Sequence, residues 1–174
     1  LTPVGAWANP ARLAAGRPWE RPAWQRYFGM DPVTMERFRD AVREALDGRT
    51  LTREALIAAV IVMPGLHHIG DGLRSGWGTL LKPIAWQGVL CFGPQSGNRV
   101  TFMRPDQASR RWAGLPDPEA AGPVALTAYL GAYGPATPTG FRNWLSRGLA
   151  PARRVHGWLA DLGDRVVPMF VGCE

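Results

Sequence analysis

The sequence predicts a mostly α-helical chain with short β-hairpins, an α+β protein, and three observations support this prediction. Apolar residues recur at helical spacing in several separate stretches. Two short β-prone runs, at 89–92 and 100–103, interrupt that spacing and are joined by turn residues. The same order of elements begins again after a proline-containing linker. With 174 residues, the chain has room for one ordinary domain or two small ones.

The first predicted helix begins at Asp31-Pro32, where an acceptor side chain precedes a residue that has no N–H to satisfy. Its apolar stripe consists of Met35, Phe38, Val42, Ala45 and Leu46. Asp47-Gly48 ends this helix. Thr52 then caps a short second helix. The inward residues of that second helix are Leu56, Ala59 and Val60.

A third helix is predicted from about Gly72, and a hairpin follows it. The inward stripe of this helix consists of Leu73, Trp77, Leu80, Leu81 and Ile84. Pro83 should kink or shorten the helix, because its nitrogen cannot bond to the carbonyl of Thr79. The runs 89–92 and 100–103 are the two strands of the hairpin.

The second half of the chain repeats the pattern with three more helices. Gly134 closes the first, Thr137-Pro138 begins the second, and Pro151 and Gly163 bound the third. Their inward residues are Leu126, Tyr129, Leu130 and Tyr133, then Phe141, Trp144 and Leu145, then Val155, Trp158, Leu159 and Leu162. Residues 166–171 are predicted to be one strand of a hairpin whose return strand is missing.

Three short helices followed by a hairpin is the order of a winged helix-turn-helix, in which the third helix reads DNA. We therefore expect two tandem units of this kind. The predicted divisions are an irregular N-terminal segment at 1–30, unit one at 31–104, a linker at 105–117 and a truncated unit two at 118–174. Both ends of the sequence resemble fragment boundaries, since it lacks an initiator Met and ends abruptly.

The charge indicates a polyanionic partner, although its distribution weakens that signal. The net charge is +6, and 19 of the 20 basic residues are Arg. Residues 1–30 contribute +3, residues 31–104 contribute +2, residues 105–115 contribute +1, and residues 116–174 are balanced. Much of the excess therefore lies outside the two regions predicted to fold.

Several classes of protein are excluded by simple counts. The longest apolar stretch, 55–63, stops at Pro64 and is far shorter than the roughly 20 residues that cross a bilayer. No signal peptide is visible at the start of the sequence. Two cysteines 82 positions apart form neither a disulfide framework nor a zinc site, which fits the reducing cytoplasm. We expect a cytoplasmic protein with no cofactor and no metal.

Four strings in this order carry a resemblance to a known family: DGRTLTREAL, LLKPIAWQGVLCFGP, RVTFMRPD and AYGPATPTGFRNWL. They resemble the bacterial winged-helix DNA-binding-domain proteins related to crosslink-repair DNA glycosylases. The resemblance covers residues 31–174. It implies a middle section of a longer protein, built from tandem winged helices and followed by a β-rich part.

The resemblance also implies where catalysis would lie. Glycosylase members of the family carry a Gln, an apolar residue and then Gln or Asp, ahead of the region matched here. The Gln residues of this chain are Gln25, Gln87, Gln95 and Gln107, and none has Gln or Asp two positions away. No catalytic residue is therefore assigned. The sequence contains no phosphate-binding glycine loop, no Gly-x-Ser-x-Gly motif and no His-Glu-x-x-His motif.

Seven residues are candidates for DNA contact. The outward side of the third helix carries Ser75, Thr79 and Lys82, with Arg74 on its flank, which are suitable groups for phosphates or base edges. The tip of the hairpin carries Asn98 and Arg99, and the third helix of unit two carries Arg153. An ordinary solvated surface is the alternative for each set, and it is favoured for the hairpin tip, where an exposed Arg is common. The unit-two face is small and nearly uncharged, so it also suits packing against another domain.

Two further groups have simpler interpretations. His67 and His68, with Asp71 nearby, could bind a metal ion or act as a general base. The simpler interpretation, which we prefer, is an ordinary pair of histidines in a loop or a core. Trp77, Trp144 and Trp158 are expected in cores. Trp7, Trp19, Trp24 and Trp112 lie in irregular segments and could stack on a ligand.

The sequence therefore predicts double-stranded DNA binding by tandem winged-helix units of a larger protein, in DNA repair. Two alternatives stay open. The chain is part of a glycosylase acting on alkylated or crosslinked bases, with its catalytic motif elsewhere, or it is a non-catalytic structural module. The expected partner is double-stranded DNA, and no binding to a membrane is expected. Contacts with other domains of the same protein or with a second copy are a further possibility.

Overall fold

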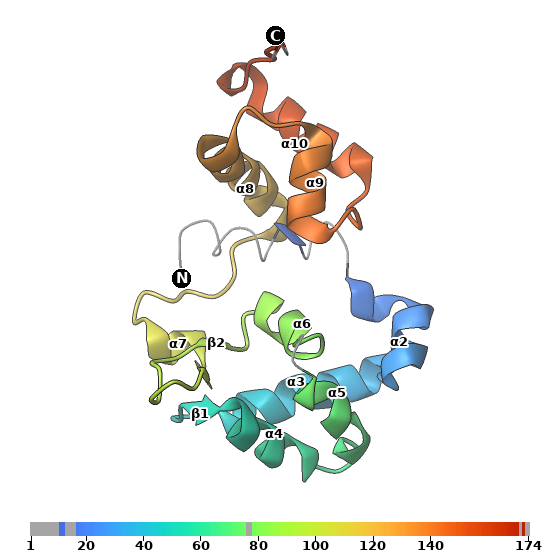
Figure 1. Cartoon of the computed structure of the whole chain (residues 1–174), viewed down its shortest axis with the longest axis vertical. Helices are drawn as coiled ribbons and strands as arrows, with labels where there is room; N and C mark the ends of the chain where they lie inside the picture. The colour runs from blue at the N-terminus through green and yellow to red at the C-terminus, as the bar shows by residue number, and fades with distance from the viewer. Residues whose placement is uncertain (1–10, 13–16, 76–77, 171, 173–174) are drawn as a thin grey trace. The chain divides into compact units, whose positions relative to one another are not determined.

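The computed structural model of the chain describes residues 11–12, 17–75, 78–170 and 172. The chain divides into two compact units (Figure 1). We call residues 17–114 the N-terminal unit, and residues 115–174 together with 1–16 the C-terminal unit. Trp7 and Trp77, two tryptophans considered above, lie outside the described residues.

The first two predicted helices of the N-terminal unit are present and capped as expected. Helix α3 (Pro32–Ala45) begins where the Asp31 side chain accepts a hydrogen bond from the Thr34 amide at 2.7 Å. Helix α4 (Arg53–Ile61) begins where the Thr52 hydroxyl accepts one from the Ala55 amide at 3.3 Å. The two helices pack together. Their buried side chains are Met35, Phe38, Ala41, Val42 and Ala45 on α3, and Leu56, Ile57 and Val60 on α4.

The hairpin is present as part of a three-stranded antiparallel sheet. Strands β2 (Cys91–Phe92) and β3 (Thr101–Met103) pair as predicted. Strand β1 (Leu51–Thr52) was not predicted; it pairs with the other edge of β3, giving the order β1-β3-β2. The sheet joins the N-terminal end of α4 to the hairpin, because β1 leads directly into that helix.

The third helix is not continuous, which corrects the sequence prediction. A 3₁₀ turn η2 (His67–Ile69) leads into α5 (Gly70–Arg74), and after a break α6 runs over Leu81–Trp86. Gly78 lies in the break with φ of +60°, a conformation that ends a helix and suits glycine. The apolar stripe still faces inward, because Leu73, Leu80, Leu81 and Ile84 are all buried.

Two stretches outside the predicted helices also form helical structure. Within the segment expected to be irregular, η1 covers Pro18–Glu20 and α2 covers Pro22–Phe28. Within the expected linker, α7 covers Pro105–Ala108. Pro stands at the start of all three, where its missing N–H needs no partner. Trp19 is buried rather than available for stacking.

The C-terminal unit is built from α8 (Pro118–Tyr133), α9 (Pro138–Ser146) and α10 (Ala152–Leu162), followed by the 3₁₀ turn η3 (Gly163–Arg165). Thr137 caps α9, accepting a hydrogen bond from the Gly140 amide at 3.0 Å. The helices share one hydrophobic core. Its buried residues are Ala11, Ala121, Ala125, Leu126, Tyr129, Phe141, Leu145, Ala150, Val155, Trp158 and Leu162.

Three details of this unit differ from the sequence predictions. Tyr133, expected to face inward, is 59% exposed because it lies at the end of α8. Residues 166–170 form no strand, since no other described segment pairs with them. Ala11 was assigned to an irregular segment but lies in the core, and beside it Arg12 donates a hydrogen bond from Nε to the Leu145 carbonyl at 2.6 Å.

The α+β class is confirmed, with helices predominating and one small antiparallel sheet. In the described part of the chain, no helix is both long enough and apolar enough to span a bilayer.

Candidate nucleic-acid interface

Four of the predicted DNA-contacting residues lie around the break between α5 and α6. Arg74 is the last residue of α5, and Ser75 follows it directly. Thr79 lies half-buried in the turn before α6, and Lys82 is exposed in the first turn of that helix. The break therefore places these polar groups on a bent segment rather than on one face of a continuous helix.

The two cations of this segment are not equally available. Arg74 forms an exposed ion pair with Asp71, with 3.0 Å between Nη1 and Oδ1. Among the described residues Lys82 has no ion pair. A phosphate would compete with Asp71 for Arg74, whereas Lys82 can bind a phosphate without losing a protein partner.

Arg53 holds this bent segment in place, and sequence reasoning missed it. Its guanidinium donates hydrogen bonds from Nε to the Leu73 carbonyl at 3.2 Å and from Nη2 to the Ser75 carbonyl at 2.5 Å. Those carbonyls lie at the end of α5, where backbone acceptors lack partners within the helix. Because Arg53 is the first residue of α4, it ties the start of α4 to the break.

The hairpin tip is a tight turn that presents the other two candidates. The backbones of Ser96 and Arg99 exchange two hydrogen bonds, of 3.2 Å and 3.1 Å, across Gly97 and Asn98. Gly97 has a φ of +62°, as a hairpin turn with glycine at its first central position requires. Asn98 and Arg99 are both exposed.

The charge of the hairpin tip acts at the same helix end that Arg53 occupies. The pKa of the Glu54 carboxyl is lowered chiefly by hydrogen bonds from its own amide and from Thr52, and the positive charges of Arg99 and Arg53 lower it further. Strand β1 leads directly into α4 and pairs with β3 of the hairpin, while Arg53 binds the end of α5, so the hairpin and the α5–α6 break are both joined to the start of α4. Sequence separation conceals this arrangement, since Arg99 and Ser75 are far apart along the chain.

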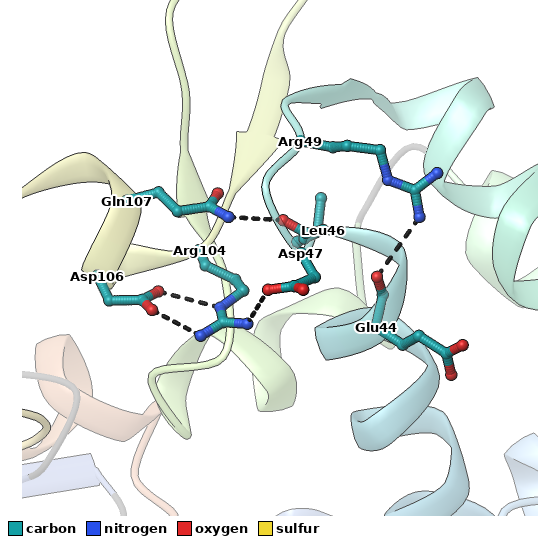
Figure 2. A network of polar contacts seen from close by, with 7 residues as sticks. All are labelled: Glu44, Leu46, Asp47, Arg49, Arg104, Asp106 and Gln107. Carbon is teal, nitrogen blue, oxygen red and sulfur yellow. Dashed lines mark hydrogen bonds and ion pairs between the residues drawn. The ribbon is translucent and has the colours of Figure 1, made fainter.

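The base of the hairpin is fixed to the end of α3 by an Arg104 network, shown in Figure 2. Arg104 directly follows β3 and forms a two-pronged ion pair with Asp106, at 3.0 Å and 2.6 Å, while its Nη1 lies 2.6 Å from Asp47 Oδ1. Gln107 donates a hydrogen bond to the Leu46 carbonyl at 3.1 Å. The network orients the hairpin relative to the helices and leaves its tip exposed.

Arg153, the candidate in the C-terminal unit, lies exposed in the first turn of α10. Its neighbour Arg154 is not available in the same way, because it forms an ion pair with Glu119 of α8. The rest of the outward face carries His156, Gly157 and Ala160, all exposed. The face is thus weakly charged, as the sequence indicated.

The histidine pair forms no metal site within the described residues. No group of three or more His, Cys, Asp or Glu side chains there could hold a metal ion. Nε2 of His68 donates a hydrogen bond to the Gly29 carbonyl at 2.9 Å, and Asp71 is paired with Arg74. The pair is exposed in η2 rather than buried in a core.

Comparison with known proteins shows the family to which this chain belongs. A family model described as "DNA glycosylase AlkZ-like" matches residues 6–171. The chain is 40% identical over 172 residues to an interstrand DNA cross-link repair glycosylase of Streptomyces sahachiroi, covering 98% of this chain and 46% of that protein. The solved structure of Streptomyces sahachiroi DNA glycosylase AlkZ superposes with a TM-score of 0.83 at 38% identity, covering 96% of this chain and 45% of that one.

The chain therefore spans less than half the length of the relatives it matches. The match nevertheless runs through both units and through the α5–α6 break, the hairpin and α10. This chain belongs to the AlkZ-like DNA glycosylase family.

Proposed function

We propose that this chain is the part of a DNA glycosylase that binds double-stranded DNA, and that its N-terminal unit does so as a winged helix-turn-helix. One observation carries the proposal: Arg53 in the first turn of α4 binds the end of α5, and β1, directly before α4, pairs with β3 of the hairpin. In a winged helix these two elements are the reading helix and the wing. Membership of this family indicates that the partner is DNA. Because the expected partner is DNA, we expect the protein to act in the cytoplasm.

Each residue has a distinct part in the proposed complex. Lys82 and Arg99 neutralise phosphates, and their release of counterions supplies most of the affinity. The hydroxyls of Ser75 and Thr79 donate to phosphates or base edges and fix the register. Arg53 is a positioning residue, because its guanidinium donates hydrogen bonds to backbone carbonyls at the end of α5. No residue of this chain is assigned to the cleavage of a glycosidic bond.

Salt-dependent binding to a short duplex, followed by fluorescence anisotropy, tests the proposal. We expect log K to fall steeply with log salt, and the slope to fall by about 0.9 for each phosphate contact removed. Lys82→Ala and Arg99→Ala should each reduce the slope by about that amount. Arg37→Ala is the matched control, since it removes one exposed charge from α3. Absence of binding at low salt, or an equal loss in the control, would overturn the proposal.

The C-terminal unit admits two proposals, and Arg153 distinguishes them. If α10 is a second DNA-reading helix, Arg153→Ala should weaken duplex binding as much as Lys82→Ala does. If its neutral face packs against another domain or a second copy, that substitution should leave affinity within about twofold. The exposed, nearly uncharged surface at Gly157 and Ala160 favours packing.

A further inference from the structure

An aromatic and basic surface on α2 lies outside the proposed duplex-binding elements. Trp24, Tyr27 and Phe28 are spaced at i, i+3 and i+4 and form one ring cluster. The Phe28 ring centroid lies 4.6 Å from that of Trp24 and 4.7 Å from that of Tyr27. Tyr27 is 82% exposed, which leaves the side of the cluster that it forms open to solvent. Trp24 and Phe28 are partly buried, so Tyr27 is the ring of this cluster that a ligand can reach most fully.

Other contacts also hold α2 in place. The helix packs on η1, and Gln25 donates a hydrogen bond to the Trp19 carbonyl at 3.0 Å. Trp19 is the buried tryptophan of this region, and its ring lies beside that of Trp86. Of the three rings, that of Tyr27 contributes least to packing, since it is 82% exposed.

Each end of α2 carries an arginine. Arg21 immediately precedes α2 and Arg26 lies in its last turn, and both are exposed. Among the residues that the structure describes, neither forms an ion pair. An exposed tyrosine ring on the same short helix as two arginines without ion pairs has the chemistry to stack a nucleic-acid base and bind nearby phosphates.

The surface also lies close to the proposed DNA interface. Gly29 ends α2, and its carbonyl accepts the hydrogen bond from His68 in η2. Turn η2 leads directly into α5, so one short turn separates the end of α2 from the α5–α6 segment. Figure 1 shows α2 and α5 in the same region of the N-terminal unit.

We propose that the α2 surface of Trp24, Tyr27 and Phe28, with Arg21 and Arg26, binds unpaired DNA bases next to a duplex by stacking. This inference rests on the proposed duplex binding and adds a second class of contact to it. Bases paired within a duplex hide their faces, so the surface acts only on an extruded, bulged or single-stranded nucleotide.

Anisotropy on two DNA probes tests this inference with the whole chain. One probe is a fully paired duplex, and the other is the same duplex with a short single-stranded overhang. The wild type should bind the overhang probe at least fivefold more tightly. Tyr27→Ala should abolish that preference while leaving affinity for the paired duplex unchanged. Tyr27→Phe should retain the preference, because it keeps the ring face that stacks.

Tyr133→Ala is the matched control, since it removes another exposed tyrosine but from the C-terminal unit. It should bind both probes as the wild type does. Equal wild-type affinity for the two probes, or a Tyr27→Ala variant that keeps the preference, would overturn this inference alone. Failure of the wild type to bind either probe at low salt would overturn the proposed function as well.

Discussion

Replacing Arg53 by Met tests whether a single side chain holds the α5–α6 break in place. Methionine keeps an apolar stem of similar length but removes both hydrogen bonds, to the carbonyls of Leu73 and Ser75. A hydrogen bond from a charged group contributes about 1.5–3 kcal/mol. Since Arg53 is half-buried and water can reach part of the site, we expect the pair together to contribute about 1.5–3 kcal/mol rather than twice that.

The loss should appear first as local opening rather than as global unfolding. Hydrogen exchange resolved by peptide should show faster exchange at the Ser75 amide, which bonds to the Asp71 carbonyl at 3.1 Å. Urea denaturation measures the overall loss. Duplex affinity should fall with little change in salt slope, because a positioning residue makes no phosphate contact.

Arg53→Lys separates charge from geometry. Lysine keeps the positive charge near Glu54 but cannot offer the planar fork that reaches two carbonyls. We expect Arg53→Lys to lower the free energy of unfolding by most of the amount that Arg53→Met does. A cost below about 0.5 kcal/mol for Arg53→Met, with unchanged exchange at Ser75, would refute the reasoning.

Two further predictions concern the contacts that stabilise each of the two units. In the N-terminal unit, the hydrogen bond from Arg104, and after it the positive charge of Arg104, lowers the pKa of the Asp106 carboxyl below its ordinary value of 3.8. The stabilisation that this ion pair gives is complete above the ordinary pKa and is lost as the pH falls through the lowered pKa of the folded state. Acid titration of stability should therefore be flatter for Asp106→Asn, and an unchanged curve would contradict the ion pair. In the C-terminal unit, Gly122→Ala should lower stability by about 1–3 kcal/mol in urea denaturation, since an added Cβ would overlap the buried Trp158 ring. Gly131→Ala on the same helix meets no described atom within 4 Å and should gain up to about 1 kcal/mol; equal effects of the two would contradict the packing.

Local signals explain which helices the sequence could predict. α3, α4 and α9 each begin at a side-chain cap that is visible in the sequence, and α10 begins after Pro151. The interior stripes of these helices are buried nearly as predicted. The hairpin was also predictable, because its turn residues lie between two β-prone runs.

The missed features depend on partners distant in sequence. Strand β1 is two residues long, and only its pairing with β3, Leu51 with Phe102 and Thr52 with Thr101, makes it a strand. Ala11 joins a core whose other members begin at Ala121. The apolar stripe of the third helix runs through its break, since both halves face the same core. A periodic pattern records which side is buried but not whether the backbone is continuous.

The candidate site was predictable as a set of residues but not as an arrangement. Arg74, Ser75, Thr79 and Lys82 are close in sequence, and their grouping was expected. The role of Arg53 was not expected, because an arginine at a helix N-terminus gives no signal that it bonds to carbonyls 20 and 22 residues away. The ion pair between Arg74 and Asp71 was not expected either, and it makes Arg74 less available to a phosphate than Lys82.

Hydrogen exchange of the chain with and without a short duplex tests the central claim most directly. It reports which backbone segments the DNA covers, independently of any substitution. The account predicts that protection gathers in two peptides, one spanning the α5–α6 break and one spanning the hairpin tip around Asn98 and Arg99. Protection confined to α10, or absent from both peptides while the duplex is bound, would contradict it.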